Sequence, residues 1–226
     1  MRRLIIAVDG PAGSGKSSVS KEVAIRSGIK YVDSGALYRS ITLYMLEKFG
    51  ELDSPHDYGA IAAQEMTITQ EFHADGSSCT FVNGRDVSLL IRDERITKNI
   101  GKISDNRSAR DFVTSLLRSW ATEESIIMDG RDIGTVVFPD ADLKIYCDAS
   151  VDVRAERRKQ EYAERGKNVD VNEIKHQIML RDDQDRGRAF GALKIADSAI
   201  ILDTSNMTKA QVIDTFLDLI RQQKGE

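Results

Sequence analysis

Eight residues near the N-terminus have the types and the spacing needed to bind phosphate. The pattern G-x-x-x-x-G-K-[ST] is matched at every fixed position by Gly10-Pro11-Ala12-Gly13-Ser14-Gly15-Lys16-Ser17. Glycines let the backbone curl so that successive N–H groups point into one concavity. The lysine then reaches the β- and γ-phosphates, and the serine hydroxyl binds Mg²⁺. We therefore predict that residues 10–18, Ser18 included, bind ATP, with Ser17 as ligand of a Mg²⁺ cofactor; a glycine-rich turn without a ligand is the alternative.

Carboxylates follow two later apolar runs. Asp33 comes directly after residues 29–32, and Asp129 directly after residues 125–128. Open α/β sheets bind ligands at the carboxyl ends of their strands, so Asp129 is expected close to the phosphate-binding loop. There it either holds the metal through a water or caps the turn that follows its strand, as aspartate often does.

The elements that must position these residues alternate along the chain. Short apolar runs are found at 4–8, 29–32, 125–128, 143–147 and 199–202. Helical spacing is found at 17–27, 36–48, 94–120, 151–163, 171–186 and 209–223. This alternation predicts an α/β fold, a doubly wound parallel sheet of about five strands.

One region, from about residue 60 to 87, breaks this rhythm. Residues 66–72 alternate apolar and polar side chains, and turn residues follow at Asp75-Gly76 and at Asn83-Gly84. Asn-Gly is a strong hairpin signal. We predict a small antiparallel sheet inserted into the α/β domain; an edge hairpin of the main sheet is the alternative.

Composition narrows the class of protein. The chain has 226 residues, a length that fits a single domain carrying an insertion, and a net charge of −4, which argues against a nucleic-acid polymer as partner. No apolar stretch approaches the roughly 20 residues needed to span a bilayer, and no signal peptide is recognised. Cys79 and Cys147 share no metal or redox motif, so both are expected as free thiols in a reducing cytoplasm. A monomer is the default expectation.

Three further motifs give the chain its resemblance to a family. They are Asp33-Ser-Gly-Ala-Leu-Tyr-Arg39, Asp129-Gly-Arg-Asp-Ile-Gly-Thr135 and Arg181-Asp-Asp-Gln-Asp-Arg-Gly-Arg188. The last of these, taken alone, is typical of a solvated helix face. In order with the phosphate loop and the inserted sheet, they make residues 4 to about 202 resemble bacterial cytidylate kinase. That resemblance implies transfer of the ATP γ-phosphoryl group to CMP or dCMP. It also implies a core (1–59 and 96–226), an acceptor-binding lobe (60–95) and a helical lid (152–169).

The resemblance also implies roles for individual residues. Acceptor binding falls to Ser34, Arg39, Arg110, Arg131, Asp132, Arg181, Asp185 and Arg188. Lys16, Arg131 and Arg188 act on the transferring group, and Asp33 arranges metal-bound water. Arg154 and Arg158 bind ATP from the lid, although a plain charged surface helix is the competing interpretation of residues 151–163.

These residue types suit the implied chemistry. Arginine forks bind phosphate oxygens bidentately and stay charged. Asp132 can accept a hydrogen bond from the cytosine 4-amino group while Arg110 donates to N3 and O2. Uracil presents an acceptor at position 4 and a donor at N3, so the pair can favour cytosine over uracil by as much as about 10⁴-fold.

One position departs from the family. Some relatives carry a serine near the base where this chain has Gly101, and the nearby Ser104 can take the place of that serine. The other interpretations are a kinase for UMP or shikimate and a regulatory NTPase; the latter often carries Asn-Lys-x-Asp, which is absent from this sequence.

Overall fold

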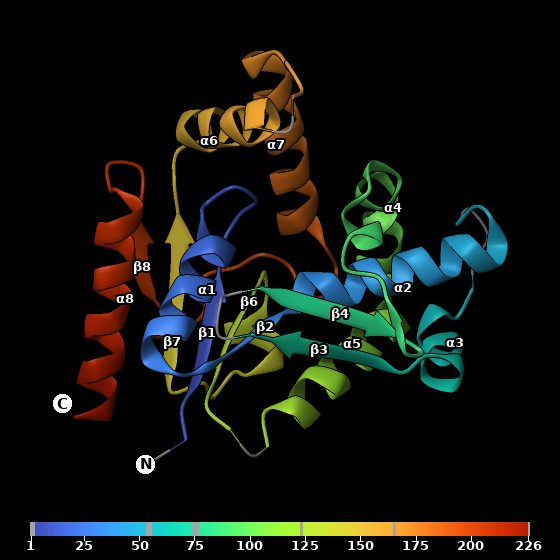
Figure 1. Cartoon of the computed structure of the whole chain (residues 1–226), viewed down its shortest axis with the longest axis horizontal. Helices are drawn as coiled ribbons and strands as arrows, with labels where there is room; N and C mark the ends of the chain where they lie inside the picture. The colour runs from blue at the N-terminus through green and yellow to red at the C-terminus, as the bar shows by residue number, and fades with distance from the viewer. Residues whose placement is uncertain (1–2, 53–55, 74–76, 123, 165, 226) are drawn as a thin grey trace.

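A five-stranded parallel sheet forms the centre of the molecule. The computed structural model describes residues 3–52, 56–73, 77–122, 124–164 and 166–225. The sheet has the order β2-β6-β1-β7-β8 (Figure 1). Its strands are β1 (Ile5–Asp9), β2 (Lys30–Asp33), β6 (Ile126–Gly130), β7 (Leu143–Asp148) and β8 (Ile200–Asp203). All neighbouring pairs are parallel, so the predicted doubly wound α/β fold is confirmed.

Helices cover both faces of this sheet. One face carries α1 (Lys16–Ser27) and α8 (Lys209–Lys224), and the other carries α2 (Ser34–Phe49) and α5 (Arg107–Trp120). Successive side chains of β1 alternate between the two: Ile6 and Val8 are buried with Phe216 of α8, and Ala7 is buried with Leu37 of α2. Burial on both faces explains why each strand reads as a continuous apolar run.

The prediction of one helix over residues 94–120 is wrong, because two helices occupy this stretch. α4 (Glu94–Ser104) ends before Asp105, and α5 begins after Asn106. The Asn106 side chain accepts a hydrogen bond from Ala109 N at 3.0 Å, which satisfies a free N–H in the first turn of α5. A further helix, α3 (Tyr58–Glu65), was not predicted.

The inserted region forms a separate antiparallel sheet, as predicted. Its strands are β3 (Ile68–Phe72), β4 (Ser78–Val82) and β5 (Arg85–Asp86). The hairpin between β4 and β5 turns at Asn83 and Gly84, whose φ values are 51° and 79°, so both are left-handed as this turn requires. The predicted turn at Asp75-Gly76 lies outside the described residues. The boundaries of the acceptor lobe, 60–95, remain a prediction.

Two helices that pack against each other extend beyond the carboxyl edge of the main sheet (Figure 1). They are α6 (Val151–Glu164) and α7 (Val171–Gly187), and they share a small core of Ala155, Ile174 and Ile178. Residues 152–169, the predicted lid, contain most of α6; residue 165 lies outside the described part. That this segment moves as a lid remains a prediction.

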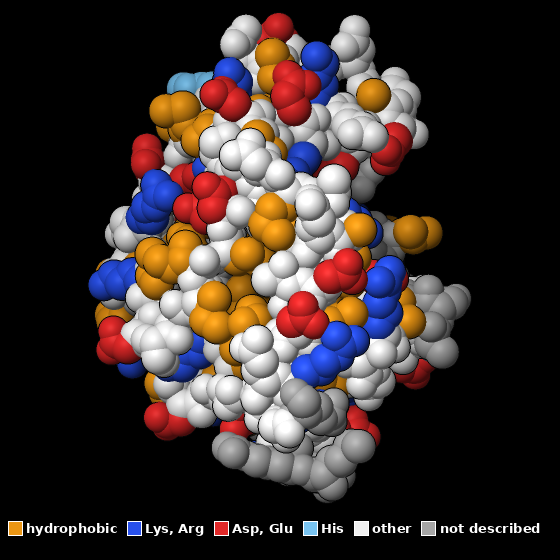
Figure 2. Space-filling view, turned by 90° about the vertical axis from the view of Figure 1, so that its left-hand side faces the viewer, with side chains coloured by type: hydrophobic (Ala, Val, Ile, Leu, Met, Phe, Trp, Pro, Cys, Tyr) orange, Lys and Arg blue, Asp and Glu red, His pale blue; other side chains and the backbone are white. Residues whose placement is uncertain are grey.

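Figure 2 shows the side of the molecule that carries α8 and β8, with hydrophobic side chains gathered across its middle. Ile200 and Ile201 of the edge strand β8 are 40% and 58% exposed. Within the described ranges, no helix combines the length and the apolar character needed to cross a membrane.

Candidate functional site

The phosphate-binding loop connects β1 to α1 and is closely packed. Gly10, with φ 151°, lies so near β7 that a Cβ there would be 2.0 Å from the Cys147 carbonyl oxygen. The Ser14 hydroxyl is buried and has no hydrogen-bond partner among the described residues. A loop of tightly curled backbone with a free buried hydroxyl fits a bound phosphate group.

Lys16 lies at the centre of this loop and is 6% exposed. Its Nζ donates to Pro11 O at 3.0 Å, so the amine is folded back over the loop. Burial, followed by the nearby Arg131 guanidinium, lowers the pKa of Lys16 to about 7. Bound phosphate oxygens would supply a negative charge beside this buried amine and so favour its protonated form. Ser18 lies at the outer side, where its hydroxyl donates to Gly15 O at 3.0 Å.

Ser17 and Asp129 meet between the loop and β6. The Ser17 hydroxyl donates to Asp129 Oδ2 at 2.5 Å, and Tyr31 Oη donates to Asp129 Oδ1 at 2.5 Å. The carboxylate therefore faces the loop and does not cap the following turn. Burial, followed by the charge of Asp33, raises the pKa of Asp129. Hydroxyl and carboxylate oxygens fit Mg²⁺, which is usually bound by one or two protein oxygens together with substrate phosphates. The described residues contain no cluster of three or more His, Cys, Asp or Glu side chains that could hold a metal ion.

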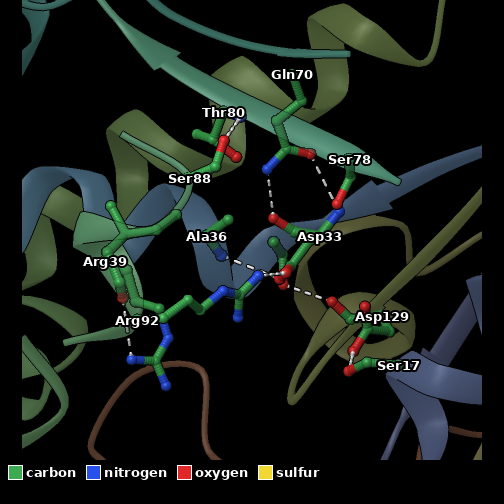
Figure 3. Close-up of polar contacts among 12 residues, drawn as sticks. Ser17, Asp33, Ala36, Arg39, Gln70, Ser78, Thr80, Ser88, Arg92 and Asp129 are labelled. Carbon is green, nitrogen blue, oxygen red and sulfur yellow. Dashed lines mark hydrogen bonds and ion pairs between the residues drawn. The ribbon is translucent and has the colours of Figure 1, made fainter. Parts of the chain in front are cut away.

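Asp33 is the register partner of Asp129 on the neighbouring strand β2. Its side chain caps α2 by accepting from Ala36 N at 3.0 Å, and it also pairs with Arg92 at 2.6 Å (Figure 3). Burial acts to raise the pKa of Asp33, but the Arg92 guanidinium holds it below its usual value. Gln70 of β3 binds the Asp33 peptide on both sides, accepting from its N–H at 3.1 Å and donating to its C=O at 2.8 Å.

The arginines predicted to bind the acceptor converge near these carboxylates. Arg131 Nε and Arg188 Nη2 contact opposite oxygens of Asp185, each at 2.7 Å. Arg39 Nη1 donates to Thr97 Oγ1 at 3.0 Å. Burial, followed by Arg131, lowers the pKa of Arg181 to about 9.

Arg181 has no ion pair or hydrogen bond to any described residue, a state that suits a group awaiting an anion. Burial, followed by the charge of Arg92, lowers the pKa of Arg39 to about 10. The charges of Arg39, Arg131 and Arg181 act on one another's surroundings, which indicates that these guanidiniums lie in the same region of the site.

The residues predicted to recognise the base form a buried ion pair. Arg110 Nη2 lies 2.5 Å from Asp132 Oδ2, and the two side chains are each 6% exposed. Arg110 Nη1 also donates to Ser104 O at 2.8 Å. Ser34 is turned away from this pair, since its hydroxyl donates to Asp129 O at 2.6 Å. A Cβ on Gly101 would approach nothing nearer than Asp105 Oδ2 at 4.0 Å, so a serine has room there.

The two lid arginines differ in their surroundings. Arg154 is 2% exposed: its Nε donates to Ala149 O at 2.9 Å, its Nη1 donates to Ala12 O at 3.1 Å, and its Nη2 pairs with Asp182 at 2.7 Å. Arg154 therefore supports the phosphate loop, and direct contact with ATP remains a prediction. Arg158 is half-buried, with its guanidinium 5.7 Å from the Tyr162 ring centre.

Four residues of this region were missed by the sequence reasoning. Arg157 donates to Ser14 O at 3.3 Å and Thr204 O at 2.8 Å. Arg92 and Tyr31 contact the carboxylates of Asp33 and Asp129, and Gln70 contacts the Asp33 backbone. Strand alternation could have identified Tyr31, because residues two apart on β2 share a face with Asp33. No signal in the sequence pairs Arg92 or Gln70 with Asp33.

Known proteins resemble the chain at two levels. The sequence model of the family described as cytidylate kinase matches residues 6–222. A cytidylate kinase of Lactobacillus johnsonii is 42% identical over 223 residues, which cover 97% of this chain and 94% of that protein. One of Lactobacillus gasseri is 41% identical with the same coverage. Among solved structures, a gluconokinase from Sinorhizobium meliloti has a TM-score of 0.50 at 14% identity, covering 99% of this chain and 97% of its own. At that identity the likeness concerns the fold alone.

Proposed function

The chain belongs to the cytidylate kinase family, and from this premise we propose that it transfers the γ-phosphoryl group of ATP to CMP or dCMP. The products are ADP and CDP or dCDP. One observation carries the proposal: the buried Arg110–Asp132 pair lies beside the acceptor arginines, and the phosphate loop lies at the same edge of the sheet. A donor for a base edge, an acceptor for a base edge and a set of phosphate-binding cations are thus brought together.

Positioning and electrostatic stabilisation account for the chemistry we propose. The phosphate of CMP is already deprotonated near neutral pH, so no protein base is required. Lys16 holds the β- and γ-phosphates, and Arg131, Arg188 and Arg181 bind the acceptor phosphate and the transferring group. These cations offset the repulsion between two polyanions and stabilise charge that develops on the equatorial oxygens. When bound, Mg²⁺ supplies further neutralising charge at the phosphates, and Ser17 with Asp129 would hold it.

Base selectivity is assigned to Asp132 and Arg110. In the proposed complex Asp132 accepts from the 4-amino group of cytosine, and Arg110 donates to N3 and O2. Arg110 and Asp132 already hydrogen-bond to each other. In the proposed complex this ion pair stays formed, or opens only in part, when the base binds. With UMP, the Asp132 carboxylate would face the uracil O4 acceptor and the Arg110 guanidinium would face the N3–H donor. Buried groups left without a hydrogen-bond partner in this way lower the affinity.

An acceptor panel tests this proposal. The purified chain is mixed with ATP, Mg²⁺ and, separately, CMP, dCMP, UMP, AMP and shikimate, and ADP release is followed. We expect rapid ADP release with CMP or dCMP, with the matching diphosphate detected by ³¹P NMR, and little with the other acceptors. Equal, slow ATP hydrolysis in every mixture would reject the kinase assignment, and a preference for shikimate or UMP would reject the assigned acceptor.

A further inference from the structure

Tyr31 is buried beside the site but has no part in the chemistry described above. It lies on β2 and is 2% exposed. Its hydroxyl donates to Asp129 Oδ1 at 2.5 Å, while Ser17 donates to Asp129 Oδ2 at 2.5 Å. A phenol has a single O–H donor, and here that donor is committed to this carboxylate. With one donor on each oxygen, the plane of the Asp129 carboxylate is fixed.

The chemical type of this donor matters. Asp129 is 4% exposed and has a second carboxylate, Asp33, as its register partner. A lysine or arginine in place of Tyr31 would also bind Asp129, but its positive charge would compete with a bound cation. A phenol orients the carboxylate and leaves its negative charge uncompensated. The negative charge of Asp129 therefore stays available to a cation that binds on the side of Ser17.

The small antiparallel sheet determines where the Tyr31 ring lies. Phe72 of β3 packs against this ring with the centroids 5.6 Å apart and the planes at 58°. The Lys21 ammonium lies 5.6 Å from the ring centre and donates to Ser78 Oγ of β4 at 3.1 Å. The Tyr31 ring is thus contacted by the inserted sheet, and its hydroxyl binds Asp129 of β6.

From these contacts we propose that Tyr31 is a positioning residue for metal-bound ATP: its hydroxyl orients Asp129 toward the Ser17 side of the phosphate loop. The inference rests on the proposed use of Mg²⁺ and ATP, and it makes no use of the acceptor. Loss of the hydroxyl leaves the Asp129 carboxylate free to rotate and removes one of its two donors. The loss therefore weakens the binding of ATP with Mg²⁺ more than the binding of ATP alone.

Binding measurements on Tyr31→Phe test this role. The dissociation constant of ATP is measured by calorimetry with Mg²⁺ and again with EDTA, for the wild-type chain and the variant. We expect a loss of about 10- to 100-fold with Mg²⁺, the equivalent of one hydrogen bond to a charged group, and less than about twofold without it. Equal losses in both conditions, or no loss in a folded variant, would overturn the proposal.

The chain offers a matched control in Tyr44→Phe. Tyr44 also donates to a carboxylate, Glu65 Oε2 at 2.6 Å, but that pair joins α2 to α3. Its removal should leave both dissociation constants unchanged. If Tyr31→Phe does not fold, Asp129→Asn is compared with the double variant Asp129→Asn/Tyr31→Phe. The added change should then leave the ratio of the two constants unaltered, and a further loss would contradict the role.

The outcome is separable from that of the acceptor panel. Failure of the wild-type chain to phosphorylate CMP would reject the proposed function without changing the two ATP dissociation constants. Conversely, an active kinase whose Tyr31→Phe variant binds ATP with and without Mg²⁺ as the wild type does would reject only the role of Tyr31.

Discussion

The donor and acceptor halves of the site hold their cations in different ways. In the donor half, Lys16, Arg154 and Arg157 donate to backbone carbonyl oxygens of residues 11, 12 and 14, and of these three Arg154 also pairs with a carboxylate, that of Asp182. In the acceptor half, four arginines pair with carboxylates: Arg92 with Asp33, Arg110 with Asp132, and both Arg131 and Arg188 with Asp185. A carbonyl comes with the backbone, whereas each carboxylate must be supplied by another segment of the chain.

This difference has an energetic consequence. Removing a cation bound to a carbonyl leaves a neutral dipole, but removing one partner of a buried ion pair leaves an uncompensated charge. We therefore expect substitutions of Lys16 and Arg157 in the donor half to cost activity more than stability, whereas Arg154, which pairs with Asp182, is an exception. Substitutions in the acceptor half should cost both. The predictions that follow test this contrast, beginning with the largest effect.

Replacing Lys16 by methionine should have the largest effect on activity. The variant removes the loop's charge for the β- and γ-phosphates, and kcat/KM should fall by at least about 10²- to 10³-fold, the loss typical of one preorganised group that stabilises a transition state. The melting temperature should stay the same or rise, because an amine that is 6% exposed gives way to an apolar side chain of similar length.

Steady-state kinetics and thermal melts measure the two quantities for Lys16→Met. Lys30→Met serves as the control, since the Lys30 ammonium makes an exposed contact with Glu124 at 3.5 Å, away from the phosphate loop. A Lys16→Met variant that melts several degrees lower would break the contrast, because the donor half would then depend on its charge for folding.

The same contrast explains what could be predicted from the sequence. The donor half is local: residues 10–17 contain the loop, its lysine and its metal-binding serine, and the apolar runs place it at a strand end. The acceptor half is assembled from β2, residues 90–92, the turn after β6, α5 and α7. Its pairs span large sequence separations, as between Arg131 and Asp185. Spacing carries no information on such pairs, so those residues came from the family resemblance.

Other features followed from tertiary packing that no local pattern encodes. The run 94–120 has helical spacing throughout, but the Asn106 cap divides it. Arg154 and Arg157 are three residues apart on one helix, and the sequence does not indicate that both of them contact carbonyl oxygens of the phosphate loop. The Asn83-Gly84 turn was predictable because its left-handed backbone depends on those two residues alone.

An intermediate effect is expected for Asp132→Asn. The amide keeps one oxygen as acceptor for Arg110 but replaces the charged acceptor for the cytosine amino group. KM for CMP should rise by about 10- to 100-fold, while KM for ATP changes by less than about twofold. Selectivity for CMP over UMP should shrink.

The free energy of unfolding should distinguish Asp132→Asn from the more severe Asp132→Ala. Asp132→Ala leaves the buried Arg110 guanidinium without its carboxylate, and breaking such a pair costs about 3–5 kcal/mol, measured by denaturant unfolding. Asp111→Asn is the control, because Asp111 pairs with Arg107 on the exposed face of α5. If Asp132→Ala is as stable as the wild type, the acceptor half does not depend on its ion pairs as the contrast requires.

The smallest effect is a difference in proton uptake between the two substrates. Because burial lowers the pKa of Lys16 to about 7, the amine is mostly neutral at pH 8 in the free protein. Bound phosphate favours the charged form and raises this pKa, so ATP binding at pH 8 should take up most of one proton. CMP binding should take up little, since Arg181, with a pKa of about 9, is already charged at that pH.

Calorimetry in buffers with different ionisation enthalpies measures this uptake directly. The binding enthalpy of ATP should vary with the buffer at pH 8 and vary much less at pH 6, where Lys16 is already protonated. In Lys16→Met the variation at pH 8 should disappear. Comparable uptake with ATP and with CMP would place the titrating group outside the phosphate loop, and the donor half would then lose the property that most sharply distinguishes it from the acceptor half.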